Sequence, residues 1–280
     1  MRIRHALYLV LLASLIAGCR GLDASSTPAP ATASATASTT LTALPTHTEP
    51  ADPSATARPS PTPLPQPCDH AYLPVVSGAN WTYAVSGNPT GDFEFTEQVT
   101  AVRASGFTLT SRIAGEIFPH TWACDEDGLT ARQFDGMAAA GIALAGGQIT
   151  LVTDSVEGVS LPADLAPGTR WQQQYTISGS QAFPGLGTLP VKGTLTVDYT
   201  TLAIEAVSVP FGSFKALHIH SESMYDVRVG SGLLSFSPEL FGSSEIYFVE
   251  DLGMVRVEIE FSLMGDLQHT VVALTSYSFR

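Results

Sequence analysis

Hydrophobic and polar residues alternate with a period of two along most of the chain after residue 68. In one clear run, Leu195, Val197 and Tyr199 alternate with threonines and an aspartate. Successive side chains of a β-strand point to opposite faces of a sheet, so this alternation indicates strands with one buried face. The pattern predicts an all-β domain over residues 68–280.

Short segments that contain Gly, Pro or Asp separate these runs, for example Asp127-Gly128 and the Pro-Phe-Gly at residues 210–212. Gly and Asp tolerate the positive φ of tight turns, so neighbouring runs are expected to pair as antiparallel strands. The alternation slips between Leu202 and Glu205, which predicts a β-bulge or a turn there. The expected fold is a large, curved antiparallel sheet, either a half-barrel or a sandwich.

Two stretches of this domain are similar to each other. Gly78 stands three residues before Trp81, and Gly168 stands three residues before Trp171. Each tryptophan begins a short run that ends in an aliphatic residue followed by Ser-Gly. The similarity predicts two related β lobes. Chance similarity is the alternative.

The first residues have a different pattern. Arg2 and Arg4 precede an apolar run that is too short to cross a bilayer and that ends in Ile-Ala-Gly before Cys19. This arrangement resembles the lipobox of bacterial lipoproteins, which implies that residues 1–18 are a signal peptide. Cys19 would then carry diacylglyceryl and N-acyl chains such as palmitate. Several acyl chains give stable membrane anchoring, since each buried CH₂ contributes about 0.8 kcal/mol.

Residues 24–67 consist mainly of Ala, Ser, Thr and Pro. Such a segment cannot bury a core, so residues 19–67 are predicted to form a lipidated N-terminus and a disordered stalk. The stalk would span roughly 35–40 Å as a coil and about 135 Å as polyproline II. The predicted location is therefore extracytoplasmic and lipid-anchored to the cell membrane, facing either the surface or the periplasm.

The formal net charge of −13 at pH 7 excludes one class of partner. An acidic surface repels nucleic acid, so no nucleic-acid binding is expected. Two cysteines, Cys68 and Cys124, remain once Cys19 is lipidated. In an exported domain they are expected to form a disulfide. A catalytic thiol is the alternative, although neither cysteine has a local nucleophile motif.

Several side chains have the chemistry for binding. His218, His220 and Glu222 alternate on one predicted strand and share a face, a geometry that suits zinc. A solvent-facing strand explains them equally well, so they are weak candidates, and no metal or cofactor is expected. The tryptophans are expected to fill the core, with a sugar-stacking platform as the alternative.

Two apolar stretches, residues 137–147 without a charged residue and residues 230–242 with Glu239 alone, interrupt the otherwise acidic domain. Apolar segments in loop-like positions are typical of binding surfaces. They predict two lips of a site for an apolar or amphiphilic ligand, with the candidate residues Met137, Ile142, Leu144, Leu233, Leu234, Phe236 and Phe241.

Four motifs resemble those of a group of uncharacterised bacterial lipoproteins: Tyr-Leu-Pro at 72–74, Gly-x-x-Trp-x-Tyr at 78–83, Val-x-Val-Pro-x-Gly-x-Phe-x-Ala-Leu at 207–217 and Phe-Val-x-x-Leu-Gly-Met-Val at 248–255. The resemblance covers most of residues 68–280. It implies curved antiparallel sheets similar to the half-barrels of LolA/LolB-type lipoprotein carriers. It implies no catalytic residues.

The sequence contains no nucleophile elbow, phosphate-binding loop or zinc-protease motif, and we expect no enzymatic activity. It predicts a monomeric, membrane-anchored lipoprotein of the cell envelope with a β-rich domain that binds an apolar or amphiphilic ligand. An envelope structural or protein-interaction module is the alternative, and a hydrolase is the less favoured one.

Overall fold

A computed structural model describes residues 68–89, 91–134, 149–183, 187–263 and 266–279. All of them belong to one compact unit, Pro61–Arg280. In this part of the chain no helix combines the length and the apolar character that crossing a bilayer requires. The predicted signal peptide, Cys19 and the stalk lie outside the described residues and stay predictions.

The described residues form one 13-stranded antiparallel sheet, which confirms the predicted all-β class. The sheet is curved and not closed, with β6 and β7 at its two edges. A short 3-10 helix, η1 (Gly232–Leu234), follows β10. In sheet order the strands are β6 (Ile149–Gly158), β8 (Arg170–Phe183), β9 (Gly187–Val209), β10 (Gly212–Val229), β11 (Leu240–Val249), β12 (Gly253–Leu263), β13 (Asp266–Ser278), β1 (Asn80–Ser86), β2 (Phe93–Arg103), β3 (Gly106–Ile113), β4 (Glu116–Asp125), β5 (Gly128–Ala131) and β7 (Leu161–Pro162).

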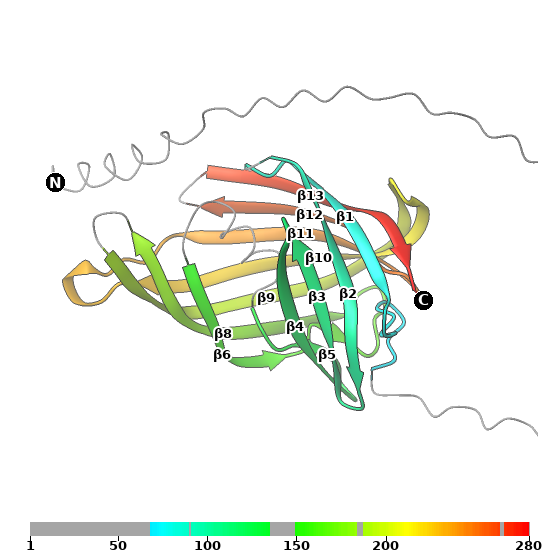
Figure 1. Cartoon of the computed structure of the whole chain (residues 1–280), viewed down its shortest axis with the longest axis horizontal. Helices are drawn as coiled ribbons and strands as arrows, with labels where there is room; N and C mark the ends of the chain where they lie inside the picture. The colour runs from blue at the N-terminus through cyan, green and yellow to red at the C-terminus, as the bar shows by residue number, and fades with distance from the viewer. Residues whose placement is uncertain (1–67, 90, 135–148, 184–186, 264–265, 280) are drawn as a thin grey trace, which may run out of the picture. The chain divides into compact units, whose positions relative to one another are not determined.

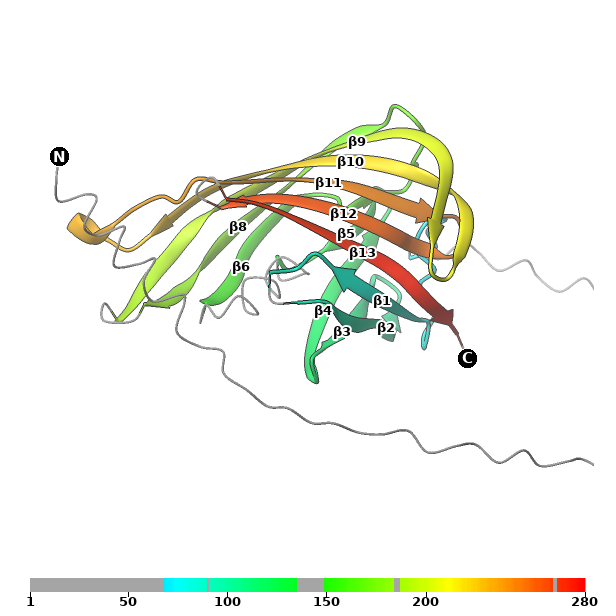
Figure 2. The ribbon, with the colours of Figure 1, turned by 90° about the horizontal axis from the view of Figure 1, so that it is seen from above.

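The curvature brings the two halves of the sheet face to face. Strands β2–β5 cross in front of the long strands β9–β12 (Figure 1), and the view from above shows β1–β4 beneath the arch of those strands (Figure 2). The β9–β10 ladder shifts register between Leu217 and Ile219, opposite Leu202. This is the slip that the alternation predicts, and bulges of this kind bend strands.

The hairpins also follow the sequence signals. Asp125 pairs with Gly128, so β4 and β5 form the predicted hairpin, with Glu126 and Asp127 in the turn and Gly128 as the first residue of β5. Gly128 has a φ of 137°, and a Cβ there would lie 2.1 Å from the carbonyl oxygen of Leu161 on β7. Only glycine permits both this turn and the close approach of the edge strand.

The two similar stretches make equivalent hydrogen bonds. Gly78 and Gly168 have φ angles of 89° and 92°. Trp81 then pairs with Glu97 on β2, and Trp171 pairs with Tyr199 on β9. In each copy the glycine N–H donates to a residue of the partner strand, and the N–H of that residue donates back to the residue after the glycine. In the first copy these bonds are Gly78 N to Val99 O (2.8 Å) and Val99 N to Ala79 O (2.9 Å). In the second copy they are Gly168 N to Thr201 O (2.8 Å) and Thr201 N to Thr169 O (2.9 Å). The hairpins β1–β2 and β8–β9 are therefore local repeats.

The inner face of the sheet holds two hydrophobic cores. The first core includes Trp81, Phe107 and Val255 and joins β1–β5 to the strands opposite. The second core includes Ile177 and Leu195 and lies on β8–β10, with Leu151 and Val156 of β6 packed against it. The disulfide predicted between Cys68 and Cys124 is present within the first core. Both cores and the disulfide lie within residues 68–279, so this segment contains its own stabilising contacts.

Candidate ligand-binding cavity

A partly open cavity of about 160 Å³ lies on the inner face, at the boundary of the two cores. Except for one serine, its lining is apolar or aromatic. An apolar cavity of about 150 Å³ accepts a benzene ring, so this one has room for a ring or a short alkyl segment. It is lined by Trp122, Ser160, Leu161, Trp171, Tyr199, Ile219, Ile246 and Phe248.

Aromatic stacking positions two walls of this cavity. The rings of Trp171 and Tyr199, a directly opposed pair on β8 and β9, lie 4.8 Å apart with an interplanar angle of 8°. The rings of Trp122 and Phe107, a pair on β4 and β3, lie 5.5 Å apart with an angle of 13°. Stacked pairs of this kind restrict ring orientation and stabilise the fold beyond simple burial. The cavity walls are therefore held in place before any ligand enters.

Several of the lining residues carry polar groups. The indole nitrogens Nε1 of Trp122 and Trp171 are buried and have no hydrogen-bond partner. Ser160 Oγ accepts a bond from the Ala131 N–H at 2.9 Å and one from Gln173 Nε2 at 2.8 Å. These bonds use both lone pairs of the hydroxyl, so its own hydrogen remains available to donate.

Tyrosines on the inner face stay neutral near the cavity. Burial raises the pKa of Tyr199 far above its ordinary value, and the nearby Tyr175 and Tyr225 raise that pKa further. Burial raises the pKa of Tyr225 to about 12, although a hydrogen bond with Ser223 opposes the shift. At neutral pH these phenols carry no charge.

A second polar group on the inner face lies in the first core. Glu97 lies on the same face of β2 as the buried Phe95 and Val99, which stand two positions before and after it. The hydroxyl of Ser111 donates to Glu97 Oε1 at 3.2 Å. Burial raises the pKa of Glu97, while the charge of His120 and the bond from Ser111 oppose the rise. Glu97 does not line the cavity, so it is not a candidate ligand contact.

The raised pKa of Glu97 predicts a pH dependence of stability. Between the ordinary carboxyl pKa of 4.5 and the raised native value, the folded state binds more protons than the unfolded state, so the free energy of unfolding falls as pH rises. Glu97→Gln is expected to remove this fall, and urea unfolding at pH 4 to 8 measures it. Glu116→Gln, at an exposed position, is the control and should keep the wild-type profile. An unchanged slope in Glu97→Gln would contradict the assignment.

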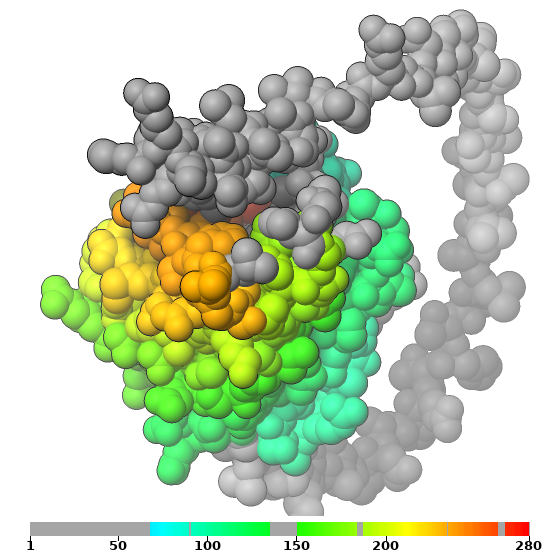
Figure 3. Space-filling view, turned by 90° about the vertical axis from the view of Figure 1, so that its left-hand side faces the viewer, coloured from blue at the N-terminus to red at the C-terminus, as the bar shows by residue number. Residues whose placement is uncertain are grey.

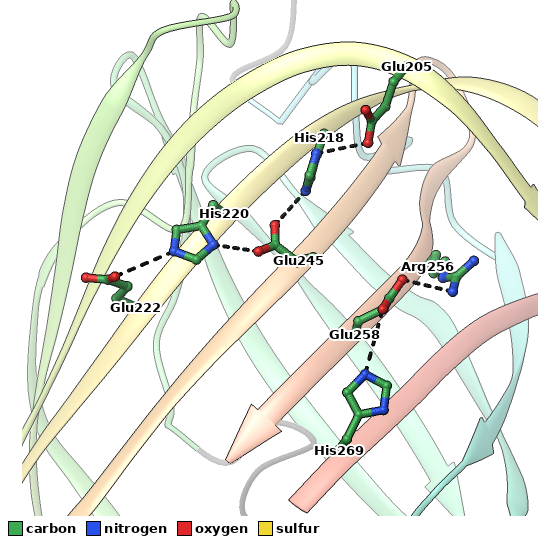
Figure 4. Close-up of polar contacts among 8 residues, drawn as sticks. All are labelled: Glu205, His218, His220, Glu222, Glu245, Arg256, Glu258 and His269. Atoms are coloured by element: carbon green, nitrogen blue, oxygen red, sulfur yellow. Dashed lines mark hydrogen bonds and ion pairs between the residues drawn. The ribbon is translucent and has the colours of Figure 1, made fainter. Parts of the chain in front are cut away.

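The predicted His-Glu face lies on the outer side of β10, away from the cavity. His218, His220 and Glu222 share this face as predicted, but their partners come from neighbouring strands (Figure 4). His218 Nδ1 lies 3.0 Å from Glu205 Oε1, and its Nε2 lies 2.6 Å from Glu245 Oε2.

The cluster continues through His220. Glu245 Oε1 lies 2.8 Å from His220 Nδ1, while Glu222 lies 3.7 Å from His220 Nε2. Among the described residues no group of three or more His, Cys, Asp or Glu side chains has the arrangement of a metal site. The observed contacts are hydrogen bonds and ion pairs, and the alternation of the sequence did not indicate Glu205 or Glu245 as partners.

The predicted lips are only partly described. Met137, Ile142 and Leu144 lie outside the described residues, as does the side chain of Leu234. Figure 3 views the end of the sheet where the β10–β11 connection meets the β8–β9 hairpin, and there Gly230 N–H donates to Pro190 O at 2.7 Å. Leu233 is fully exposed at this end.

The two phenylalanines of the second predicted lip differ in position. The ring of Phe236 lies 6.2 Å from that of Phe183, edge to face, at the margin of the second core. Phe241 is not in the connection, because β11 begins at Leu240. It pairs with the exposed Met224 and lies on the outer face, because directly opposed residues of a ladder share a face.

No family model matches this chain, and no curated protein matches it. Three solved structures are similar to part of this chain. One is a protein of Bacteroides fragilis described as exported and as having a YmcC-like fold, with 14% identity, a TM-score of 0.46 and coverage of 75% of this chain and 100% of that one.

The other two solved structures come from proteins described as lipoproteins. The first, from Parabacteroides distasonis, has 11% identity, a TM-score of 0.49 and coverage of 75% of this chain and 100% of that one. The second, the hypothetical lipoprotein YmcC of Escherichia coli, has 7% identity, a TM-score of 0.33 and coverage of 74% and 86%. The resemblance to LolA/LolB-type carriers stays a prediction.

Proposed function

We propose that this protein is a lipid-anchored extracytoplasmic lipoprotein whose curved sheet binds an apolar or amphiphilic ligand on its inner face. The observation that carries the proposal is the cavity between the two cores. Ligand sites are typically concave and apolar, with a few polar groups at defined positions, and this lining has that composition.

The volume of the cavity limits what enters it. Pockets for drug-sized ligands span roughly 300–1,000 Å³, so a cavity of about 160 Å³ holds only part of a larger molecule. A partly open cavity suits an amphiphile that inserts one end and leaves the remainder at the opening. The stacked Trp171 and Tyr199 provide an aromatic wall for that end.

Apolar material is expected to co-purify with residues 68–280. The segment, exported so that the disulfide forms, is purified without detergent, extracted with organic solvent and analysed by mass spectrometry. Trp171→Ala should lower the affinity for the bound molecule about two- to tenfold, and with it the amount that co-purifies, because stacking on an aromatic ring contributes about 0.5–1.5 kcal/mol beyond the area that it buries.

Met224→Ala is the matched control for this experiment. Met224 is an apolar residue that is 58% exposed on the outer face, so its loss should leave the bound amount unchanged. Absence of any stoichiometric apolar molecule from wild-type protein, or an equal loss in both variants, would contradict binding in the cavity.

The anchor is tested by Cys19→Ser in the full chain. Without the thiol no diacylglyceryl group can be attached, so cleavage before residue 19 is expected to stop and the acyl mass to disappear. Each lost acyl CH₂ removes about 0.8 kcal/mol of membrane affinity. Mass spectrometry of the wild-type N-terminus measures the modification directly. An unacylated wild-type Cys19 would refute the proposed anchoring.

A further inference from the structure

We propose that one end of the sheet docks onto the surface of a lipid bilayer. It is the end where β10 leads into β11 and β12 leads into β13. Its exposed large side chains, which we call the apolar end, are Met224, Leu233, Phe236, Phe241 and Leu267. This inference rests on the lipid anchor of the proposed function and adds the surface with which the domain contacts the membrane. The cavity takes no part in it.

Two residues of the apolar end belong to the connection between β10 and β11. Leu233 lies in η1 and is fully exposed, and Phe236 is 47% exposed. The connection projects from this end of the sheet (Figure 2), and in Figure 3 it faces the viewer. Leu233 is therefore presented to any surface that approaches this end.

The other three residues form a row across the outer face beside this connection. Met224 on β10 is directly opposite Phe241 on β11. Phe241 is opposite Ser262 on β12, which in turn is opposite Leu267 on β13. Directly opposed residues share a face and lie close together, and the three apolar side chains are 53–65% exposed. A group of exposed apolar side chains at one end of a domain is typical of a protein or membrane contact.

Charged residues are absent from most of the chain that forms this end. Residues 171–191, 229–238 and 261–265 contain none, and these ranges cover the ends of β8, β10 and β12 and the start of β9. The turn between β11 and β12, at the opposite end of these strands, carries Glu250 and Asp251. A charge that enters a bilayer loses its hydration at a large cost. The end without charges is therefore the one that suits insertion.

Charged residues of both signs flank these ranges, namely Lys192, Asp226, Arg228, Glu239 and Asp266. Two bases and three acids give little net charge, so attraction to anionic headgroups cannot provide the binding. Burial of the apolar side chains has to provide it. Docking of this kind needs no anionic lipid, and salt does not weaken it, because salt screens only the interactions between charges.

The predicted anchor identifies a bilayer as the surface that this end meets. The stalk would join the acylated Cys19 to the domain, and as a coil it spans roughly 35–40 Å. A tether of this length keeps the domain at a high effective concentration beside the membrane. A contact that is weak for the isolated domain is therefore formed in the anchored protein.

Flotation of residues 68–280 with phosphatidylcholine vesicles tests docking without the anchor. Wild type should float with the vesicles to the same extent at low and at high salt. Burial of a leucine side chain raises a binding constant by roughly a factor of ten or more. Leu233→Ser should therefore raise the lipid concentration for half-maximal binding about tenfold.

Leu202→Ser is the matched control. Leu202 is a leucine of β9 that is 47% exposed. It lies about 40 Å along the strand from Pro190, whose carbonyl oxygen accepts the bond from Gly230 beside the apolar end. This variant should float like wild type, and equal urea midpoints of the three proteins show that all of them are folded.

Absence of flotation of wild type, an equal loss in both variants, or release of wild type by salt would overturn docking through the apolar end. Sedimentation velocity tests another occupant, because a wild-type dimer that Leu233→Ser makes monomeric, without vesicle binding, would assign this end to a second copy of the chain. All of these outcomes leave the proposed function intact, since acylation of Cys19 and co-purification of apolar material are measured separately.

Discussion

Removal of the Cys68–Cys124 disulfide is expected to lower the free energy of unfolding by about 4 kcal/mol. The bond joins residues separated by 56 positions, and closing a loop of this length restricts the unfolded chain by about that amount in the entropic model. The double variant Cys68→Ala/Cys124→Ala avoids placing new hydroxyl groups at two buried positions. Urea unfolding of the variant and of the wild type measures the difference.

Wild-type protein unfolded in the presence of reductant is the control for this variant. It should unfold near the midpoint of the double variant, because both lack the covalent link. A loss below about 1 kcal/mol would show that the contacts of the first core, rather than the disulfide, hold residue 68 beside β4. The disulfide also attaches the start of the domain to β4, since Cys68 is the first residue after the predicted stalk.

Local features of the sheet could be predicted from the sequence because their causes are local. Asp-Gly at residues 127–128 favours a turn whatever the rest of the chain does, and the alternation around Leu217 and Ile219 indicates which side chains are buried. The slip between Leu202 and Glu205 indicated the bulge for the same reason. The disulfide followed from cysteine count and compartment.

The cavity could not be predicted, because it depends on which strands meet across the curved sheet. Trp122 and Trp171 lie far apart in sequence, and each has the alternation of a core residue. Nothing local distinguishes Trp171 from Trp81, which occupies the equivalent position of the repeat. The difference arises from the opposite wall, where Leu252 provides an acceptor for Trp81 and no residue does so for Trp171.

The predicted lips show the same limit. The first lip lies outside the described residues, and for the second the strand boundary at Leu240 places Phe241 in β11, on the outer face, and not in a connection. A shift of one position in a strand reverses the face of a side chain, so a boundary error changes an expected contact into an exposed residue. Glu205 and Glu245 were missed for a related reason, because cross-strand partners depend on register.

The two equivalent tryptophans should differ in their contribution to stability. Trp81→Ala is expected to lower the free energy of unfolding by about 4 kcal/mol, since Trp81 is 1% exposed and truncation of a buried aromatic residue costs about 3–5 kcal/mol. The substitution also leaves the Leu252 carbonyl without its donor at the β11–β12 turn. Urea or thermal unfolding of the purified domain measures the loss.

Trp171→Ala is the matched comparison and should cost at most about 2 kcal/mol, because Trp171 is only partly buried beside the cavity and its N–H makes no hydrogen bond. Residues 81 and 171 have the same strand geometry and backbone pairing, so the effects of β-propensity and register on the free energy of unfolding are the same in the two variants. Equal losses would mean that Trp171 is a structural residue like Trp81. A smaller loss at Trp171, together with a loss of ligand binding, would show that the second copy of the repeat stabilises the fold less and contributes its indole to the cavity.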